Sequence, residues 1–399
     1  MAAEYDLIIS NGVVVTDTEI REYDIAIKGE KIEKVVSWGA LKDAIAGKII
    51  DAEGGYVMPG GVDAHVHLDE PPLFRKGSTA DNYETGSRSA ICGGTTTMVT
   101  FAPQKKSEDT PRDTLLETHA KAKDACYMDY SFHLLVGNPS PNALSEFKTL
   151  REEAKNVCAK YHGPSHPPMA EIEATYRAIS LSEFIDTPIL IVHVSTPAAA
   201  NHIKQAQGRA YRYMRRLPGF EGAKCVCSPP PRESEQDLDG IWNGLANGTF
   251  TVLSSDHCPF RYEDNVMGKK SSINEKFPLS HFKYIPNGLS GIETRLALTL
   301  GADRLELKKF VEVTGANPAK LYGLWPQKGG LVEGQSDADI NIWYQPGKMT
   351  EYALKNEMLH HNVDYTPYEG KTMRQWPRYT ILRGKVVWDK ENGGLLGKK

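Results

Sequence analysis

Two histidines one residue apart, His65 and His67, are the strongest candidates for chemistry in this sequence. They close an apolar run that begins at Tyr56 and predicts a short buried strand. Residues i and i+2 of a strand share a face, so both imidazoles point the same way and can bind one metal ion. The alternative is a pair of half-exposed strand histidines without a metal. Their place at the C-terminal end of the strand favours a metal site, since this end carries the active site of a (β/α)₈ barrel.

Two further strand-like runs end in side chains that can bind a metal. Residues 188–195 deliver His193, and residues 249–256 end at Asp256. A buried histidine with satisfied hydrogen bonds and a solvated loop carboxylate are the alternatives that the residues alone leave open. We interpret the neighbouring His257 as structural.

The elements that must position these side chains are strands alternating with helices. Barrel-type strands are predicted at residues 56–67, 95–102, 128–136, 188–195 and 249–256, with helices at 80–92 and 113–125 among the segments between them. A barrel of this kind needs eight strands, and only five can be found. The predicted fold class is therefore α/β, an incomplete (β/α)₈ TIM-like barrel.

Both chain ends are rich in short β-like bursts. Residues 5–37 alternate apolar runs with turn signals such as Asn11-Gly12, and residues 338–344 and 378–388 show similar β-like runs. We predict a small β-sandwich built from both ends, with domain segments 1–55 and 329–399 around a barrel at 56–328.

Composition limits the classes of partner. The 399 residues include 47 basic and 51 acidic side chains, a net charge of −4 without long like-charge blocks, so nothing indicates nucleic acid or an anionic membrane. No apolar stretch approaches the roughly 20 residues that cross a bilayer. The six cysteines lack the spacing of a disulfide framework, which favours a reducing, cytoplasmic location. Cys225 and Cys227 offer a soft metal site only as an alternative to a structural role.

Several motifs occur in an order that resembles one family. They are Gly61-Val-Asp-Ala-His-Val-His-Leu-Asp-Glu-Pro71, Gly93-Gly-Thr-Thr-Thr97, Ile191-Val-His-Val-Ser195, Cys227-Ser-Pro-Pro-Pro231, Ser255-Asp-His-Cys258, Ile285-Pro-Asn-Gly288 and Asn317-Pro-Ala-Lys320. Together they closely resemble the dihydropyrimidinases of the cyclic amidohydrolases, nearest to the fungal-type members.

The resemblance implies a zinc-dependent hydrolase that opens the cyclic amide of 5,6-dihydropyrimidines to N-carbamoyl-β-amino acids. Carried over by position, His65, His67 and Asp256 hold the first of two zinc ions and His193 holds the second. Asp256 also serves as general base and then general acid. Ser228 and Asn287 match positions whose main-chain groups hydrogen-bond the amide edge of the substrate. Family members are commonly tetramers, so a homo-oligomer is expected.

The departures from the family matter as much as the matches. The bridging carboxylated lysine, a tyrosine that binds the oxyanion and a further histidine of the second metal have no counterpart here, and they belong to strands that cannot be found. We therefore expect the second metal to keep only His193 and the activity of this chain to be impaired. Two alternatives remain: a non-catalytic scaffold protein related to dihydropyrimidinases, and a hydrolase with a single metal. Retention of His65, His67, His193 and Asp256 argues against the scaffold protein. The number of zinc ions bound per chain distinguishes the alternatives, since one ion with turnover favours the single-metal hydrolase and none favours the scaffold.

Overall fold

The computed structural model describes residues 3–70, 79–105, 110–138, 140–143, 145–146, 220–227, 231, 235–275, 280, 284–392 and 394–395. The chain divides into two compact units, one of Met1–Leu150 with Arg215–Lys399 and one of Arg151–Met214. Every described residue belongs to the first unit. The strand predicted at 188–195, with His193, and the predicted site residue Ser228 lie outside the described residues.

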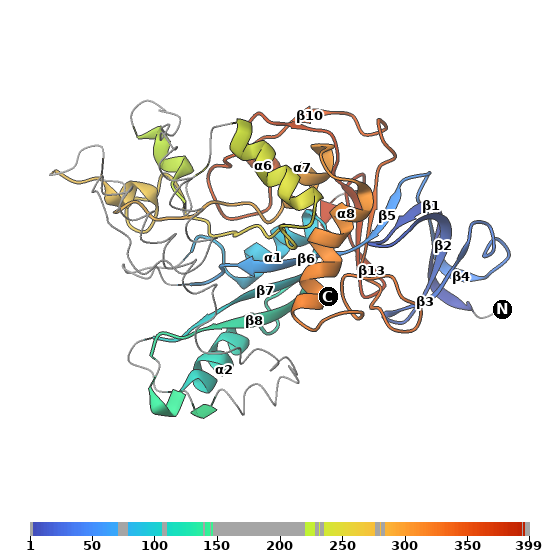
Figure 1. The fold of residues 1–399 in the computed structure, drawn as a ribbon, viewed down its shortest axis with the longest axis horizontal. Coiled ribbons are helices and arrows are strands. Elements are labelled where there is room, and N and C mark those ends of the chain that lie inside the picture. Colours follow the sequence, from blue (N-terminus) through green and yellow to red (C-terminus); the bar gives the residue numbers. More distant parts are fainter. Residues whose placement is uncertain are drawn as a thin grey trace, which may run out of the picture. The chain divides into compact units, whose positions relative to one another are not determined.

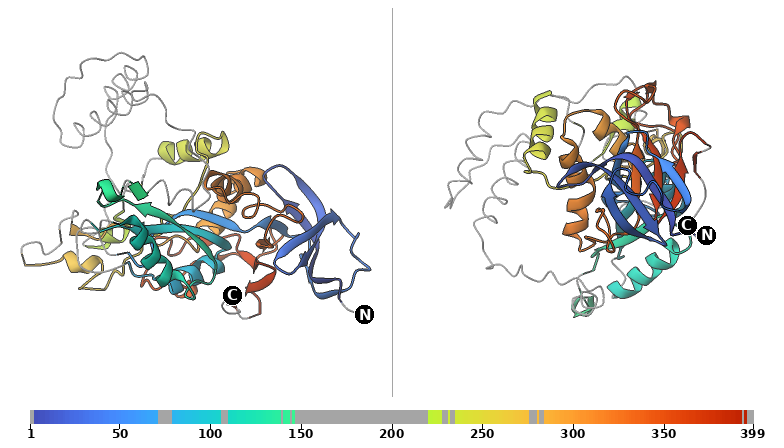
Figure 2. Two further views of the ribbon diagram at one scale, coloured as in Figure 1. Left: turned by 90° about the horizontal axis from the view of Figure 1, so that it is seen from below. Right: turned by 90° about the vertical axis from the view of Figure 1, so that its right-hand side faces the viewer.

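Strands from both ends of the chain form one mixed sheet (Figures 1 and 2). Its nine strands are β1 (Tyr5–Val15), β2 (Ile20–Lys28), β3 (Lys31–Ser37), β4 (Ala46–Asp51), β5 (Tyr56–Pro59), β9 (Ile340–Trp343), β12 (Pro377–Leu382), β13 (Lys385–Asp389) and β14 (Gly394–Leu395). The order is β14-β13-β12-β9-β5-β1-β2-β3, and β4 pairs with β1. Both ends of the chain thus contribute strands to one continuous sheet, and the division of the chain into domains stays a prediction.

The core of this sheet explains why it forms. Aliphatic side chains of both chain ends are packed together, among them Ile9, Ile27, Val57, Ile340 and Ile381. β-Branched residues suit the pleated surface of a sheet and bury well against each other. Burial of these side chains therefore joins the N-terminal and C-terminal strands, which include residues more than 300 positions apart in sequence.

The sequence predicted a turn between strands at Asn11 and Gly12, but these residues do not form one. β1 continues through them, and its pairing with β2 shifts register between Ile9 and Gly12. Asn11 adopts a positive φ of 55°. Such a backbone is tolerated by Asn, and a single bulge inside a long strand is the result.

A second sheet carries the barrel-type strands. It contains β6 (Gly61–Val66), β7 (Thr95–Pro103) and β8 (Asp129–Leu135), all parallel and in sequence order. The connecting helices α1 (Tyr83–Cys92) and α2 (Pro111–Ala122) pack against β7 (Figure 1). Asn82 begins α1 with a capping box, in which its side chain accepts from the Thr85 amide. The first three strands of the predicted barrel and the two helices between them are thus present, whereas the described residues contain no closed barrel.

The strand predicted at 56–67 is in fact two strands in different sheets. β5 pairs with β1 and β9, and β6 pairs with β7. Gly60 separates them, and a Cβ on Gly60 would lie 2.2 Å from the Thr96 hydroxyl. Only glycine allows the backbone to pass so closely from one sheet to the other. The first residues of the segment 56–328 therefore pair with the end-strand sheet, and the domain boundaries stay a prediction.

The strand predicted at 249–256 is not formed. Only isolated bridges join His257 to Val66 on one side and to Leu289 on the other. The Leu253 amide donates to the Val313 carbonyl, and the Ser255 amide donates to the Asp63 carboxylate. These contacts satisfy the segment without a ladder, yet they still place its end beside β6.

The remaining helices and short strands surround these sheets. They are α6 (Glu235–Ala246), α7 (Arg295–Gly301), α8 (Leu307–Val311), a π-helical turn (Glu312–Ala316), α9 (Asn317–Leu321), the 3₁₀ turns Glu221–Cys225, Lys269–Ser272 and Asn356–Met358, and the two-stranded pair β10 (Tyr352–Ala353) and β11 (Thr372–Met373). A large core links α1 and the parallel sheet to Trp343, Trp376 and Trp388 of the C-terminal part.

Candidate metal centre

The structure brings together three of the predicted metal ligands. His65 and His67 project from the C-terminal end of β6, and Asp256 ends the segment that bridges to Val66 through His257. Their ligand atoms all lie within 4.8 Å of one another. The two Nε2 atoms are 3.1 Å apart, and Asp256 Oδ1 lies 3.4 Å from His65 Nε2 and 3.3 Å from His67 Nε2.

These distances fit a divalent metal ion. Ligands at about 2.0–2.1 Å from a tetrahedral zinc are separated from each other by about 3.3 Å. The three measured separations lie close to that edge length, so one ion can contact all three atoms without moving them far. Asp256 and His65 are about half exposed, with 54% and 46% of their side-chain surface accessible. The open side leaves room for water and substrate.

Glu70 was missed by the sequence reasoning. Its Oε2 lies 3.0 Å from His67 Nδ1, so the carboxylate accepts the Nδ1–H and leaves Nε2 directed at Asp256. A carboxylate behind a histidine fixes the tautomer and the ring orientation that a metal ligand needs. Burial alone would lower the pKa of His67, but hydrogen bonds with Asp256 and Glu70 outweigh it and raise that pKa to about 9. Two carboxylates thus make this position strongly attractive for a cation.

Phe101 on β7 supports both imidazoles. Its ring stacks on His67 with centroids 4.6 Å apart and meets His65 edge-on at 4.7 Å. Packing of this kind restricts ring rotation. Burial lowers the pKa of His65, which keeps that imidazole neutral as metal binding requires.

A buried arginine ties the strands below the site. Arg295 of α7 pairs with Asp63 of β6 at 3.4 Å and donates to the Leu253 carbonyl at 2.6 Å. It also donates to Thr95 at the start of β7. Both members of the pair are almost fully buried. One guanidinium therefore fixes two strands and the segment that leads to Asp256.

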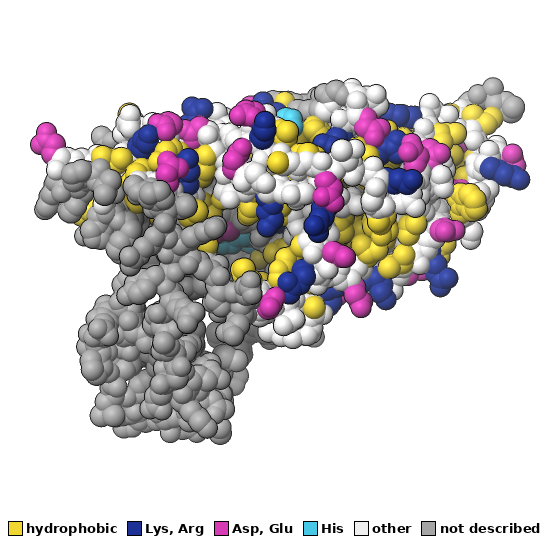
Figure 3. Space-filling view, turned by 90° about the horizontal axis from the view of Figure 1, so that it is seen from above, with side chains coloured by type: hydrophobic (Ala, Val, Ile, Leu, Met, Phe, Trp, Pro, Cys, Tyr) yellow, Lys and Arg dark blue, Asp and Glu magenta, His cyan; other side chains and the backbone are white. Residues whose placement is uncertain are grey.

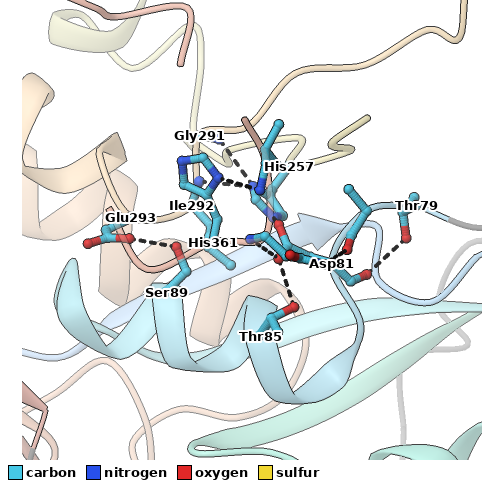
Figure 4. A network of polar contacts seen from close by, with 12 residues as sticks. Thr79, Asp81, Thr85, Ser89, His257, Gly291, Ile292, Glu293 and His361 are labelled. Carbon is cyan, nitrogen blue, oxygen red and sulfur yellow. Dashed lines mark hydrogen bonds and ion pairs between the residues drawn. The ribbon is translucent and has the colours of Figure 1, made fainter. Parts of the chain in front are cut away.

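His257 has the structural role that the sequence suggested. Its Nδ1 accepts from the Gly291 amide at 3.1 Å, so its Nε2 carries the proton and donates to Asp81 at 3.1 Å (Figure 4). Burial alone would raise the pKa of Asp81, but the hydrogen bond from His257 leads the contacts that lower it. This buried pair holds the backbone next to Asp256, whose φ of 47° lies in the left-handed region. A non-glycine residue there is held by its surroundings.

Asn287 is the one predicted substrate-binding residue within the described part of the chain. It is exposed, whereas Ile285, Pro286 and Gly288 around it are buried. Its carbonyl lies 3.7 Å from the Cys258 thiol, two residues after Asp256. Asn287 therefore lies near the metal ligands and presents itself to solvent, while His193 and Ser228 cannot be placed.

Two other groups of possible ligands are already satisfied by protein contacts. Asp129, Asp337 and Asp339 surround the buried ammonium of Lys328. Glu293 accepts hydrogen bonds from the Ser89 hydroxyl, the His360 main-chain amide and His360 Nδ1 (Figure 4 shows the Ser89 contact). Cys225 and Cys227 form no disulfide, and no metal cluster that includes them occurs among the residues described.

Comparisons with known proteins show the family to which this chain belongs. Residues 56–387 match the model of the amidohydrolase family, and the chain belongs to that family. Within it the chain is a member of the hydantoinase and dihydropyrimidinase group. It is 31% identical to a D-hydantoinase of Rhizobium radiobacter, covering 96% of this chain and 95% of that protein, and 32% identical to a D-hydantoinase of Ralstonia pickettii.

Solved structures agree. A D-hydantoinase structure has a TM-score of 0.76 at 31% identity, and the dihydropyrimidinase of Brevibacillus agri has 0.73 at 30% identity, each covering 98% of this chain. These neighbours imply the TIM-barrel amidohydrolase fold. The relatives are bacterial, so the special likeness to fungal members stays a prediction.

The alignments are longer than the chain itself. They span 456 and 469 positions for the two relatives named above, against 399 residues here. Each relative therefore contains residues that have no counterpart in this chain, and the absence of particular barrel strands stays a prediction.

Acidic and basic side chains are intermixed on the face drawn in Figure 3. Among the described residues, no helix has both the length and the apolar character needed to cross a bilayer.

Proposed function

We propose that this protein is a metal-dependent cyclic amidase of the dihydropyrimidinase type. Its substrates are 5,6-dihydropyrimidines such as dihydrouracil and dihydrothymine, which it opens to N-carbamoyl-β-amino acids. The observation that carries the proposal is the convergence of His65, His67 and Asp256 at separations that suit one metal ion.

The reaction needs water to attack an unreactive amide. The oxygen of water bonds to the ring carbonyl carbon, the bond from that carbon to the ring nitrogen breaks, and a proton moves to the nitrogen. A bound divalent metal ion would supply a lowered pKa for the attacking water and polarisation of the carbonyl.

The protein's own residues supply the rest. Asp256, half exposed and beside both imidazoles, takes the proton from the attacking water and passes it to the leaving nitrogen. His65 and His67 hold the metal, with Glu70 fixing the tautomer of His67. The main chain at Asn287 and Ser228 hydrogen-bonds the amide edge of the ring, and His193 is the remaining ligand.

Finer points belong to the same proposal. The metal is zinc, because neutral imidazoles with a carboxylate suit that ion. The chain acts in the cytoplasm, which accords with the described cysteines forming no disulfide. It forms a homo-oligomer, a tetramer by family likeness, and the large apolar side chains of Trp38 and Ile49, 62% and 59% exposed, offer area for contact between copies.

The test is a ring-opening assay on the purified chain with zinc. We expect the wild-type chain to turn over dihydrouracil, which is measured by chromatography of the N-carbamoyl product. For Asp256→Asn we expect kcat to fall by about 100-fold or more. Asp239→Asn is the matched control, because Asp239 belongs to an exposed ion pair with Arg304. A wild-type chain that binds zinc yet opens neither dihydropyrimidines nor hydantoins contradicts the proposal and favours a non-catalytic role.

A further inference from the structure

Lys269 is a buried lysine that the proposed mechanism does not use. It lies in the 3₁₀ turn Lys269–Ser272 and has no exposed surface. A charged ammonium is costly to bury unless its hydrogen bonds are satisfied. Among the described residues, no carboxylate lies within ion-pair distance of it, so the reason for its position must be sought in the neutral groups around it.

Three backbone carbonyls surround the Lys269 ammonium. Nζ donates to the carbonyls of Val226 at 2.9 Å, Pro286 at 2.7 Å and Gly288 at 2.9 Å. An ammonium has three N–H donors, so all three are used. Two of the acceptors belong to the residues on either side of Asn287. The third belongs to a separate segment, which the Gly288 amide also contacts by donating to the Val226 carbonyl at 3.1 Å.

The backbone at Asn287 is too flexible to hold this conformation by itself. Gly288 has a φ of 146°, and a Cβ there would lie 2.1 Å from the Cys258 carbonyl oxygen. Glycine is needed for the close approach, but glycine is also the most flexible residue. The Lys269 ammonium, which donates to the carbonyls of Pro286 and Gly288 on both sides of Asn287, restricts this flexible backbone.

We propose that Lys269 is a positioning residue for substrate binding, because its ammonium fixes the main chain that presents Asn287 to the amide edge of the ring. This rests on the proposed function. Burial lowers the pKa of Lys269 to about 8, in the vicinity of the thiols of Cys227, Cys258 and Cys225. A merely structural lysine would affect stability, whereas a positioning lysine must affect the binding of substrate more than the chemical step.

The experiment compares Lys269→Met with the wild-type chain. Methionine keeps an unbranched side chain but has no donors. We expect a zinc content equal to that of the wild type, a KM for dihydrouracil raised about tenfold or more, and a much smaller change in kcat. Lys270→Met is the control, because Lys270 is the next residue and pairs with the exposed Glu263 at 2.6 Å; its KM should not change.

Lys269→Gln covers the case in which the methionine variant does not fold. Its amide keeps two N–H donors, so KM should rise by less than in Lys269→Met. Acetohydroxamate, which needs only the metal, should inhibit all variants equally. An unchanged KM in a folded variant, or a fall in kcat alone, overturns the proposal for Lys269 while the hydrolase stands. A wild type without turnover overturns the proposed function and this inference with it.

Discussion

At the scale of single residues, the site depends on a carboxylate that contacts no substrate. Glu70 follows His67 by three residues and accepts its Nδ1–H at 3.0 Å. We expect Glu70→Gln to weaken zinc binding by about 10- to 100-fold, since partners behind a ligand histidine commonly carry that much affinity. The dissociation constant is measured by competition with a chromophoric chelator.

The control for this change is Asp69→Asn. It removes the adjacent carboxylate, which lies 3.2 Å from the exposed ammonium of Lys121. Zinc affinity should stay within about twofold of the wild type, because exposed ion pairs contribute little. Equal affinities for the two variants would show that Glu70 does not orient His67.

At the scale of elements, α7 holds β6 and β7 to the segment before Asp256 through Arg295. Arg295→Met leaves the buried carboxylate of Asp63 without its partner. We expect the free energy of unfolding to fall by about 3–5 kcal/mol, the usual cost of breaking a buried pair from one side. Urea denaturation measures it. The exposed pair of Arg304 and Asp239 is the comparison, and Arg304→Met should cost less than about 1 kcal/mol.

The loop after the 3₁₀ turn Asn356–Met358 should make the fold sensitive to acid through His361. Burial lowers the pKa of His361 below its ordinary 6.5. The neighbouring His257 and His360 lower this pKa further, and together these effects outweigh the carboxylates of Asp81 and Glu293, which raise it. Its Nδ1 accepts from the Val363 amide. The unfolded chain then binds a proton at a higher pH than the folded chain does. Stability is present above pH 6.5 and is lost as the pH falls below it.

His361→Asn tests this, because its amide oxygen can still accept from the Val363 amide. Between pH 7.5 and 5.5, the free energy of unfolding of the variant should fall less than that of the wild type. His119→Asn removes an exposed histidine of α2 and should leave the wild-type slope. Parallel slopes for wild type and His361→Asn would contradict the assignment.

Local patterns predicted elements better than they predicted sheets. The His-x-His strand end and the first three barrel strands with their two connecting helices follow from apolar periodicity, which is a property of neighbouring residues. The chain passes from one sheet to the other at Gly60 because its backbone lies close to Thr96, a contact that is distant in sequence. Residues 249–256 form no strand, because amides of this segment donate to Asp63 and Val313 instead of to a neighbouring strand. Glu70 and Lys269 were missed for the same reason, because their roles lie in contacts that sequence spacing does not encode.

At the scale of the whole molecule, the two ends of the chain and the metal site depend on each other. β5 lies between β1 and β9 in the end-strand sheet, and the chain passes through Gly60 directly into β6 with its histidines. Relatives align over more positions than this chain has residues, so each contains residues without a counterpart here. The first metal position keeps three ligands on elements that this framework supports.

The number of metal ions follows from that difference. Catalytic zinc sites usually take three protein ligands, and His65, His67 and Asp256 supply them at one position. Sequence comparison with the family predicts only His193 for a second position, because no match to the bridging lysine or the further histidine is expected. We expect one tightly bound zinc per chain by elemental analysis after dialysis. His65→Asn should lose it, whereas His193→Asn should keep it, because a single imidazole adds little to a site that is already complete. Two zinc ions per chain, or loss of the ion in His193→Asn, would mean that residues outside the described part complete a second site.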